Sequence, residues 1–100
     1  MKELVPPPPP LVHNQYAEIR ELFSRYVVPS YGRFELAFAR GLGSQLWDVG
    51  GRRYLDLGGG IAVCSLGHAH PEIARVLAEQ GQRLLHVSNL YYHEPQGRLA

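Results

Sequence analysis

The chain has little cysteine, lysine or long apolar sequence. Cys64 is its one cysteine, so no disulfide forms within the chain, which is typical of a reducing compartment. No apolar run approaches the roughly 18 residues of a membrane span, and the segment after Met1 is rich in proline rather than a charged head with an apolar signal core. The formal net charge is +1 without a basic stripe, which argues against a nucleic-acid partner. We therefore expect a soluble, cytoplasmic protein that binds neither membranes nor nucleic acid.

The most informative stretch is a strand pair followed by consecutive glycines. Residues 45–49 and 53–57 flank Gly50-Gly51, a pattern typical of a tight β-hairpin. Residues 58–60 are all glycine, so the hairpin is expected to lead into a glycine loop. Because glycine costs roughly 0.5–1 kcal/mol relative to alanine in regular structure, such a run indicates a turn or a close approach of the backbone to something else.

The rest of the chain predicts helices around a small sheet. Apolar spacing indicates a helix over residues 14–28, with Asn14 as its N-cap and Pro29 as its end. Residues 35–40 alternate as a first strand, and Gly41-Leu42-Gly43 is expected to turn into the hairpin. The fold class is therefore α+β: an N-terminal helix, a three-stranded antiparallel β-meander and a following helix.

The following helix is predicted over residues 72–85, after Pro71 at its first position, and a further helix opens at Glu94-Pro95. Gly81 is expected to weaken the middle of the helix over residues 72–85 by about 1 kcal/mol. Its apolar stripe is expected to be buried and consists of Ile73, Val76, Leu77, Leu84 and Leu85.

Residues 1–13 form a separate proline-rich segment. Residues 6–10 are all proline, cannot enter a helix or sheet, and extend as polyproline II at about 3.1 Å per residue. We expect a flexible arm; docking into an aromatic-lined adaptor groove is the alternative interpretation. Residues 14–100 form one domain-sized segment that stops in the first turn of a helix without a stop signal, which indicates C-terminal truncation.

His68 and His70, with Cys64 and Asp56 nearby, could be drawn as a metal site. Structural zinc needs four ligands in a tetrahedral array, and this pair lies in a loop beside a proline without a second convincing pair of ligands. We therefore predict no metal site and expect both histidines to brace the loop.

Several motifs, taken in order, resemble one family. The motifs are Arg40-Gly41, Leu46-Trp47-Asp48, Gly51-Arg52, Tyr54-Leu55-Asp56, Gly60-Ile61-Ala62-Val63, Leu66-Gly67-His68-Ala69-His70-Pro71 and Ser88-Asn89-Leu90-Tyr91-Tyr92. Their order and approximate spacing resemble the N-terminal part of the class III pyridoxal-phosphate aminotransferases, from about Tyr31 to the last residue. Ile61 in its Gly-Ile-Ala-Val setting is most similar to the acetylornithine branch, with the ornithine and 4-aminobutyrate branches as alternatives.

The resemblance implies the type I fold of pyridoxal-phosphate transferases and amino transfer from N-acetylornithine to 2-oxoglutarate in arginine biosynthesis, by a homodimer with pyridoxal 5'-phosphate as cofactor. It implies that the residues of the substrate wall are Gly60, Ile61, Val63 and Tyr31. It implies that the residues of the subunit interface or pocket rim are Ser88, Asn89 and Tyr91.

The resemblance also shows what is missing. An aminotransferase needs a lysine for the Schiff base, an acid for the pyridinium nitrogen, and backbone amides at a helix N-terminus for the phosphate. Lys2, in the proline-rich arm, is the one lysine of the chain, so we assign no catalytic and no cofactor-binding residue. A non-catalytic interaction module, which works through the arm or pairs with a separate chain, is the alternative from another class.

Overall fold

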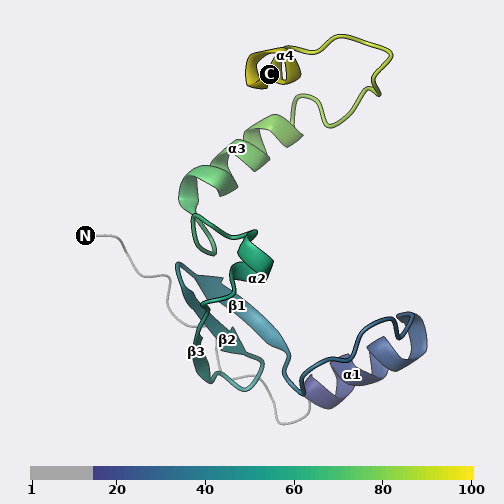
Figure 1. Cartoon of the computed structure of the whole chain (residues 1–100), viewed down its shortest axis with the longest axis vertical. Coiled ribbons are helices and arrows are strands. Elements are labelled where there is room, and N and C mark those ends of the chain that lie inside the picture. Colours follow the sequence, from purple (N-terminus) through teal and green to yellow (C-terminus); the bar gives the residue numbers. More distant parts are fainter. Residues whose placement is uncertain (1–14) are drawn as a thin grey trace. The chain divides into compact units, whose positions relative to one another are not determined.

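The computed structural model describes residues 15–100. The proline-rich arm, Lys2 and the expected N-cap Asn14 lie outside the described residues. The chain divides into two compact units, one up to His70 and one from Pro71 onward. The first holds a helix, a small sheet and a glycine-rich loop, and the second holds two helices (Figure 1).

Helix α1, Gln15–Tyr26, confirms the first predicted helix. Glu18 in its first turn and Arg25 in its last turn suit the helix dipole, and Arg25 also pairs with Glu21 one turn earlier. The helix ends at Tyr26, three residues before Pro29. The amide of the next residue, Val27, still donates to the Phe23 carbonyl at 3.1 Å.

The predicted antiparallel meander is confirmed, with strand order β1-β2-β3. Its strands are β1 (Phe38–Leu42), β2 (Gln45–Asp48) and β3 (Arg53–Leu55). The prediction placed β1 too early: Gly41 and Leu42 are strand residues that pair with Leu46 and Gln45. The turn falls at Gly43 instead, because Gly43 adopts the left-handed φ of 57°.

Side chains of the sheet pack in pairs along the strands. The rings of Phe38 and Tyr54 meet edge to face at 5.4 Å, and the Arg40 guanidinium lies 3.9 Å from the centre of the Trp47 ring. None of the described side chains is fully buried. The sheet is therefore held by its backbone ladder and these pairs rather than by an enclosed core.

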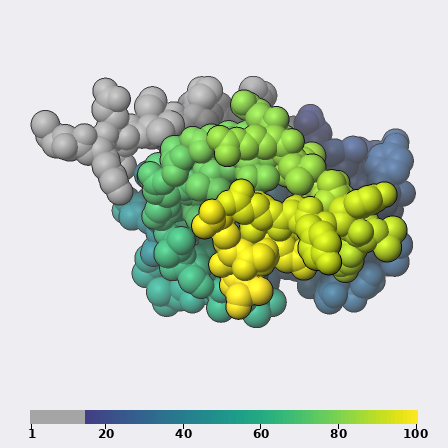
Figure 2. Space-filling view, turned by 90° about the horizontal axis from the view of Figure 1, so that it is seen from above, coloured from purple at the N-terminus to yellow at the C-terminus, as the bar shows by residue number. Residues whose placement is uncertain are grey.

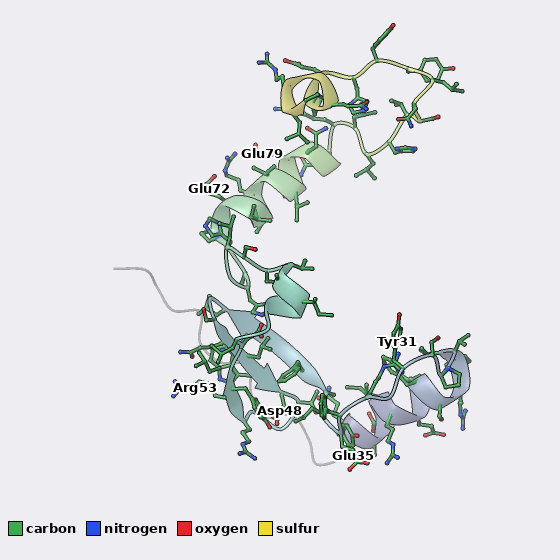
Figure 3. The ribbon with its side chains drawn as sticks, viewed as in Figure 1. Tyr31, Glu35, Asp48, Arg53, Glu72 and Glu79 are labelled. Carbon is green, nitrogen blue, oxygen red and sulfur yellow. The ribbon has the colours of Figure 1, made fainter. Side chains whose placement is uncertain are left out.

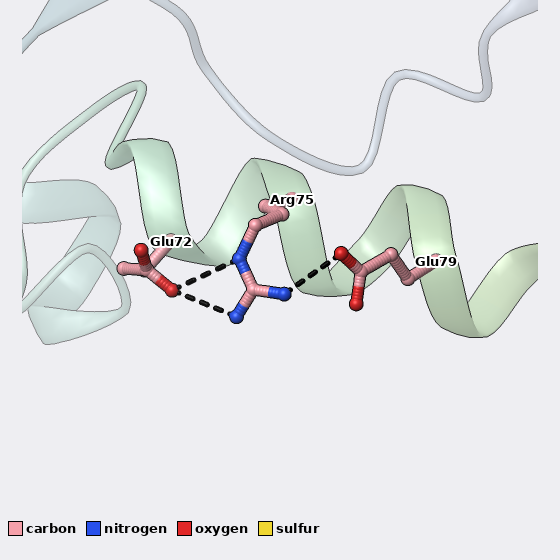
Figure 4. Close-up of polar contacts among 3 residues, drawn as sticks. All are labelled: Glu72, Arg75 and Glu79. Atoms are coloured by element: carbon pink, nitrogen blue, oxygen red, sulfur yellow. Dashed lines mark hydrogen bonds and ion pairs between the residues drawn. The ribbon is translucent and has the colours of Figure 1, made fainter.

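The second unit contains α3, Pro71–Gly81, and α4, Glu94–Leu99. The prediction that the first of these reaches residue 85 was wrong: it ends at Gly81, the residue expected only to weaken it, since glycine suits helix ends. Arg75 binds Glu72 at 2.9 Å and Glu79 at 2.8 Å along the polar face of α3 (Figure 4). This pairing supports the helix locally.

The predicted burial of the apolar stripe on residues 73–85 was also wrong. Ile73 is 46% exposed and Leu85 is 86% exposed. In α4, whose atoms are yellow in Figure 2, Leu99 is 90% exposed. Among residues 15–100, no helix is both long and apolar enough to cross a bilayer.

Candidate functional site

A left-handed turn follows the sheet, within the glycine loop that the sequence predicted. The turn is α2, Gly59–Ala62, and its φ angles are 53°, 65°, 61° and 61° in chain order. The Ala62 amide donates to Gly58 and the Cys64 amide donates to Gly59, which closes the turn. Two of the three glycines, Gly59 and Gly60, begin a left-handed path that the next two residues continue.

Left-handed backbone is costly at Ile61 and Ala62. An L-residue with a Cβ pays roughly 1–2 kcal/mol for this conformation, and a β-branched residue such as Ile61 is a genuine outlier there. Such conformations persist where the surrounding structure over-determines them, and they concentrate at functional sites. The contacts of the neighbouring residues show what holds this turn.

Asp56 is the anchor at the N-terminal side of the turn. Its Oδ1 atom accepts hydrogen bonds from the amides of Gly58 at 3.1 Å and Gly59 at 2.8 Å. Its Oδ2 atom lies 2.6 Å from Nε2 of His68. The carboxylate side chain is only 12% exposed, so both oxygens are engaged inside the loop.

His68 ties the same loop to the sheet. Its amide donates to the Gly43 carbonyl at 2.8 Å, and its carbonyl accepts from the Gly43 amide at 2.9 Å. The imidazole lies against Gly41, where an added Cβ would sit 2.5 Å from its Cγ atom. Gly67 lies against the backbone instead, since its added Cβ would sit 2.9 Å from the Gly43 Cα atom. The loop is thus seated on the end of β1 by contacts that only glycine permits.

The histidine contact lowers the pKa of Asp56 below its ordinary value. The hydrogen bond from His68 is the largest cause, and the Gly59 amide adds to it against the opposing effect of burial. The carboxylate therefore stays charged and remains an acceptor at neutral pH.

The structure brings together three of the predicted substrate-wall residues and leaves out the fourth. Gly60 and Ile61 lie in α2, and Val63 follows directly with its Cβ atom 3.8 Å from the position of a Cβ added to Gly60. Ile61 is 96% exposed and Val63 is 79% exposed. Tyr31 lies instead in the segment after α1, well away from α2 in Figure 3, and is 77% exposed.

The predicted interface residues lie in the second unit, between α3 and α4. Ser88 has a left-handed φ of 67°, which marks a sharp bend, while Asn89 and Tyr91 follow it in the same connection. The Tyr91 side chain is 68% exposed. All three side chains thus lie on one open connection, and their role as an interface stays a prediction.

A cavity of about 380 Å³ lies between α1 and the segment that leads into β1. Arg20 and Glu35 form an ion pair of 3.6 Å at its edge. None of the predicted site residues lines it. Its apolar lining comes from Tyr16, Ile19, Phe23, Phe34, Leu36, Ala37 and Phe38.

Sequence reasoning missed Asp56 as an anchor, because it considered this residue only as a possible metal ligand. The signal was present: an aspartate two residues before a glycine run is typical of a side chain that caps its own turn. Among residues 15–100, no three His, Cys, Asp or Glu side chains are grouped to share a metal ion. His68 has the bracing contacts expected of it, whereas Nδ1 of half-buried His70 has no hydrogen-bond partner among these residues.

The sequence also matches the model of a known protein family. The family model "Aminotransferase class-III" matches residues 26–100. The chain therefore belongs to the class III aminotransferase family, as its motifs predicted.

Two relatives, one matched by sequence and one by structure, are both acetylornithine aminotransferases. The acetylornithine aminotransferase of Synechocystis sp. is 58% identical over 78 residues, which are 78% of this chain and 18% of that protein. The crystal structure of acetylornithine aminotransferase from Elizabethkingia anophelis matches with a TM-score of 0.78 and 29% identity, covering 83% of this chain and 21% of that one. This chain thus spans about a fifth of the length of the curated relatives that it matches.

A further solved structure bears on the cofactor. The taurine:2-oxoglutarate aminotransferase of Bifidobacterium kashiwanohense, described in complex with PLP and glutamate, matches with a TM-score of 0.75 and 29% identity, over 90% of this chain and 21% of that one. The described residues of this chain do not fit pyridoxal phosphate by themselves, because residues 15–100 include no lysine to bond it. No chemical step through the cofactor is assigned to them.

Proposed function

We propose that this chain supplies one wall of the substrate site of an acetylornithine-type aminotransferase. The enzyme would move the amino group of N-acetylornithine to 2-oxoglutarate, as a cytoplasmic homodimer in arginine biosynthesis. The single observation that carries the proposal is the 58% identity to the Synechocystis enzyme across 78 residues. Pyridoxal phosphate would be held by polypeptide that corresponds to the other four-fifths of the relatives.

Within that wall, Ile61 is proposed to meet the substrate, with Gly60 and Val63 beside it. Two observations support this role: the Ile61 side chain is 96% exposed, and it lies on a turn whose backbone conformation is strained. The side chain has no polar atom, so it suits the apolar part of an acylated substrate. Tyr31 is proposed as a more distant part of the wall, and Ser88, Asn89 and Tyr91 as the rim near the second subunit.

A chimera tests the proposal directly. In the Synechocystis enzyme, the segment that aligns with residues 26–100 is replaced by that of this chain, and kcat/KM is measured for N-acetylornithine and for ornithine. We expect transamination with a preference for the acetylated substrate. A chimera that folds and binds pyridoxal phosphate but does not transaminate N-acetylornithine would contradict the proposal.

The Ile61→Tyr variant of the chimera tests the specificity wall. Tyrosine adds a ring and a hydroxyl that needs a partner, so acetylornithine turnover should fall more than ornithine turnover. Changes of this size alter discrimination by roughly 1–3 kcal/mol. An unchanged ratio of the two kcat/KM values would remove Ile61 from the wall.

The 100-residue chain alone should not form a specific covalent adduct with pyridoxal phosphate. Its one lysine, Lys2, lies in the proline-rich arm, outside the segment that matches the family. Borohydride trapping followed by peptide mapping measures this. A saturable adduct at Lys2 would favour cofactor binding by the chain itself.

A further inference from the structure

We infer that Asp56 and His68 are positioning residues for substrate selection: by tying the α2 turn to β1, they fix where Ile61 stands. The inference rests on the proposed function for the role of Ile61, and on contacts of this chain for the rest. Neither Asp56 nor His68 is among the predicted substrate-wall residues.

The geometry supplies a continuous set of contacts from the sheet to Ile61. Gly43 in the β1–β2 turn pairs with the His68 backbone, and the His68 imidazole lies 2.6 Å from Asp56 Oδ2. Asp56 Oδ1 in turn accepts from the amide of Gly59, the first residue of α2, two residues before Ile61. The Asp56 carboxylate joins the His68 imidazole to the Gly59 amide, so the loss of either side chain breaks this connection between the turn and His68.

The turn needs such a tie because its own conformation is unfavourable. Ile61 and Ala62 have φ angles of 61°, and both residues would relax toward negative φ if the loop were released. Relaxation of either residue would redirect the Ile61 side chain. The tie therefore controls the direction of the specificity residue without touching the substrate.

Asp48 provides a matched control. Its Oδ1 accepts from the Arg52 amide at 2.8 Å and its Oδ2 from the Tyr54 hydroxyl at 2.9 Å, so it makes the same kinds of contact in the β2–β3 hairpin. Within residues 15–100, these side-chain hydrogen bonds both stay inside the hairpin. A general loss of loop order would follow from Asp48→Ala as well, whereas loss of Ile61 positioning would not.

The kinetic test uses the chimera with Asp56→Ala, His68→Ala, His68→Gln and Asp48→Ala. We expect the two alanine variants of the tie to shift the acetylornithine-to-ornithine ratio of kcat/KM by roughly tenfold. His68→Gln should restore most of the ratio, because its amide can still donate to Asp56, and Asp48→Ala should leave the ratio unchanged. A merely structural role would lower both kcat/KM values together and leave their ratio constant.

A double-mutant cycle identifies the residue that is positioned. In an Ile61→Ala background, Asp56→Ala should no longer change the ratio, since there is no specificity side chain left to displace. An undiminished effect in that background, or an unchanged ratio in the single variants, would overturn the inference.

A second measurement separates this inference from the proposed function. In the 100-residue chain, NMR of the Gly59 and Ile61 amides should show loss of the positive φ at Ile61 in Asp56→Ala, but not in Asp48→Ala. An unchanged turn in Asp56→Ala overturns the inference whatever the kinetics show. If the turn is lost in Asp56→Ala while the chimera has no activity at all, the tie stands and the proposed function fails.

Discussion

Two aspartates anchor two loops of the first unit with the same pattern of contacts and different results. Asp48 and Asp56 each use one carboxylate oxygen for backbone amides and the other for a side chain. The side-chain partner of Asp48 is Tyr54, six residues away, and that of Asp56 is His68, twelve residues away. The first contact reinforces a hairpin whose strands already pair, whereas the second closes a loop that has little backbone ladder of its own.

The comparison shows where strain is placed in this chain. The β2–β3 hairpin meets its need for positive φ with Gly51, at 83°, at no steric cost. The other loop places Ile61 and Ala62 in that region although they carry a Cβ. The hairpin loop, which Asp48 anchors without backbone strain, serves the fold. The loop that Asp56 anchors is strained, and it carries the residues proposed to meet the substrate.

The largest expected difference between the two loops comes from adding one methyl group to each, by a glycine-to-alanine substitution. Gly67 and Gly51 have φ angles of 84° and 83°, but an added Cβ at Gly67 sits 2.9 Å from Gly43 Cα, while at Gly51 it meets nothing within 4 Å. Gly51→Ala should cost about 1–2 kcal/mol from φ alone. Gly67→Ala should cost a further ~1–3 kcal/mol from overlap.

Amide hydrogen exchange of the chain measures this difference, at Gly43 and His68 for the first loop and at Gly51 and Asp48 for the hairpin. Equal changes for the two variants would show that the approach of Gly67 to β1 is looser than the structure has it.

Acid should release the Asp56 loop and spare the hairpin. The pKa of Asp56 is lowered chiefly by His68, and the pKa of Asp48 is lowered by the Arg52 amide and Tyr54 despite the opposing effect of burial. A lowered folded-state pKa means that each stabilising contribution is complete above the ordinary value of 3.8 and is lost as pH falls through the folded-state value. The hairpin keeps its strand ladder when Asp48 is protonated.

The amide shifts of Gly59 and Arg52, followed from neutral into acid solution, check this expectation. A strand ladder that melts together with the Gly59 amide signal would contradict it.

A substitution to glycine at position 61 should change stability in the opposite direction from a substitution to glycine in the sheet. Ile61→Gly removes the left-handed penalty and should stabilise the turn by about 1 kcal/mol. Leu55→Gly, in β3 and also exposed, should destabilise its strand by roughly 0.5–1 kcal/mol. Exchange rates of the Ala62 and Leu46 amides report the two regions. If Ile61→Gly loosens the turn instead, the Ile61 side chain itself contributes to holding it.

The smallest effect concerns the hairpin aspartate. Tyr54→Phe removes a hydrogen bond that lowers the pKa of Asp48, so that pKa should rise toward its ordinary value while the strand register stays unchanged. Carbon NMR titration of the Asp48 carboxyl measures the shift. A register change would mean that the Tyr54 hydroxyl, and not the ladder, sets the hairpin.

The sequence predicted the elements better than their surroundings. Periodicity and turn residues indicated α1, the meander and the start of α3, because those signals are local. The left-handed conformation within the predicted glycine loop was missed, because nothing local states that Ile61 takes positive φ. The Asp56–His68 contact depends on which loop residues meet in space. The exposure of the apolar stripe on α3 depends on what covers that face, which its own residues do not specify.

The order of the three strands also has a consequence for how the chain acquires its shape. Every strand pairs with its neighbour in sequence, so the meander needs only short-range closures, and hairpins of this kind form within about 1–10 µs. The Gly43–His68 bridge spans a much longer stretch and costs more closure entropy. During synthesis we expect the sheet to be complete before His68 reaches it, so the α2 turn is set last, on a surface that already exists.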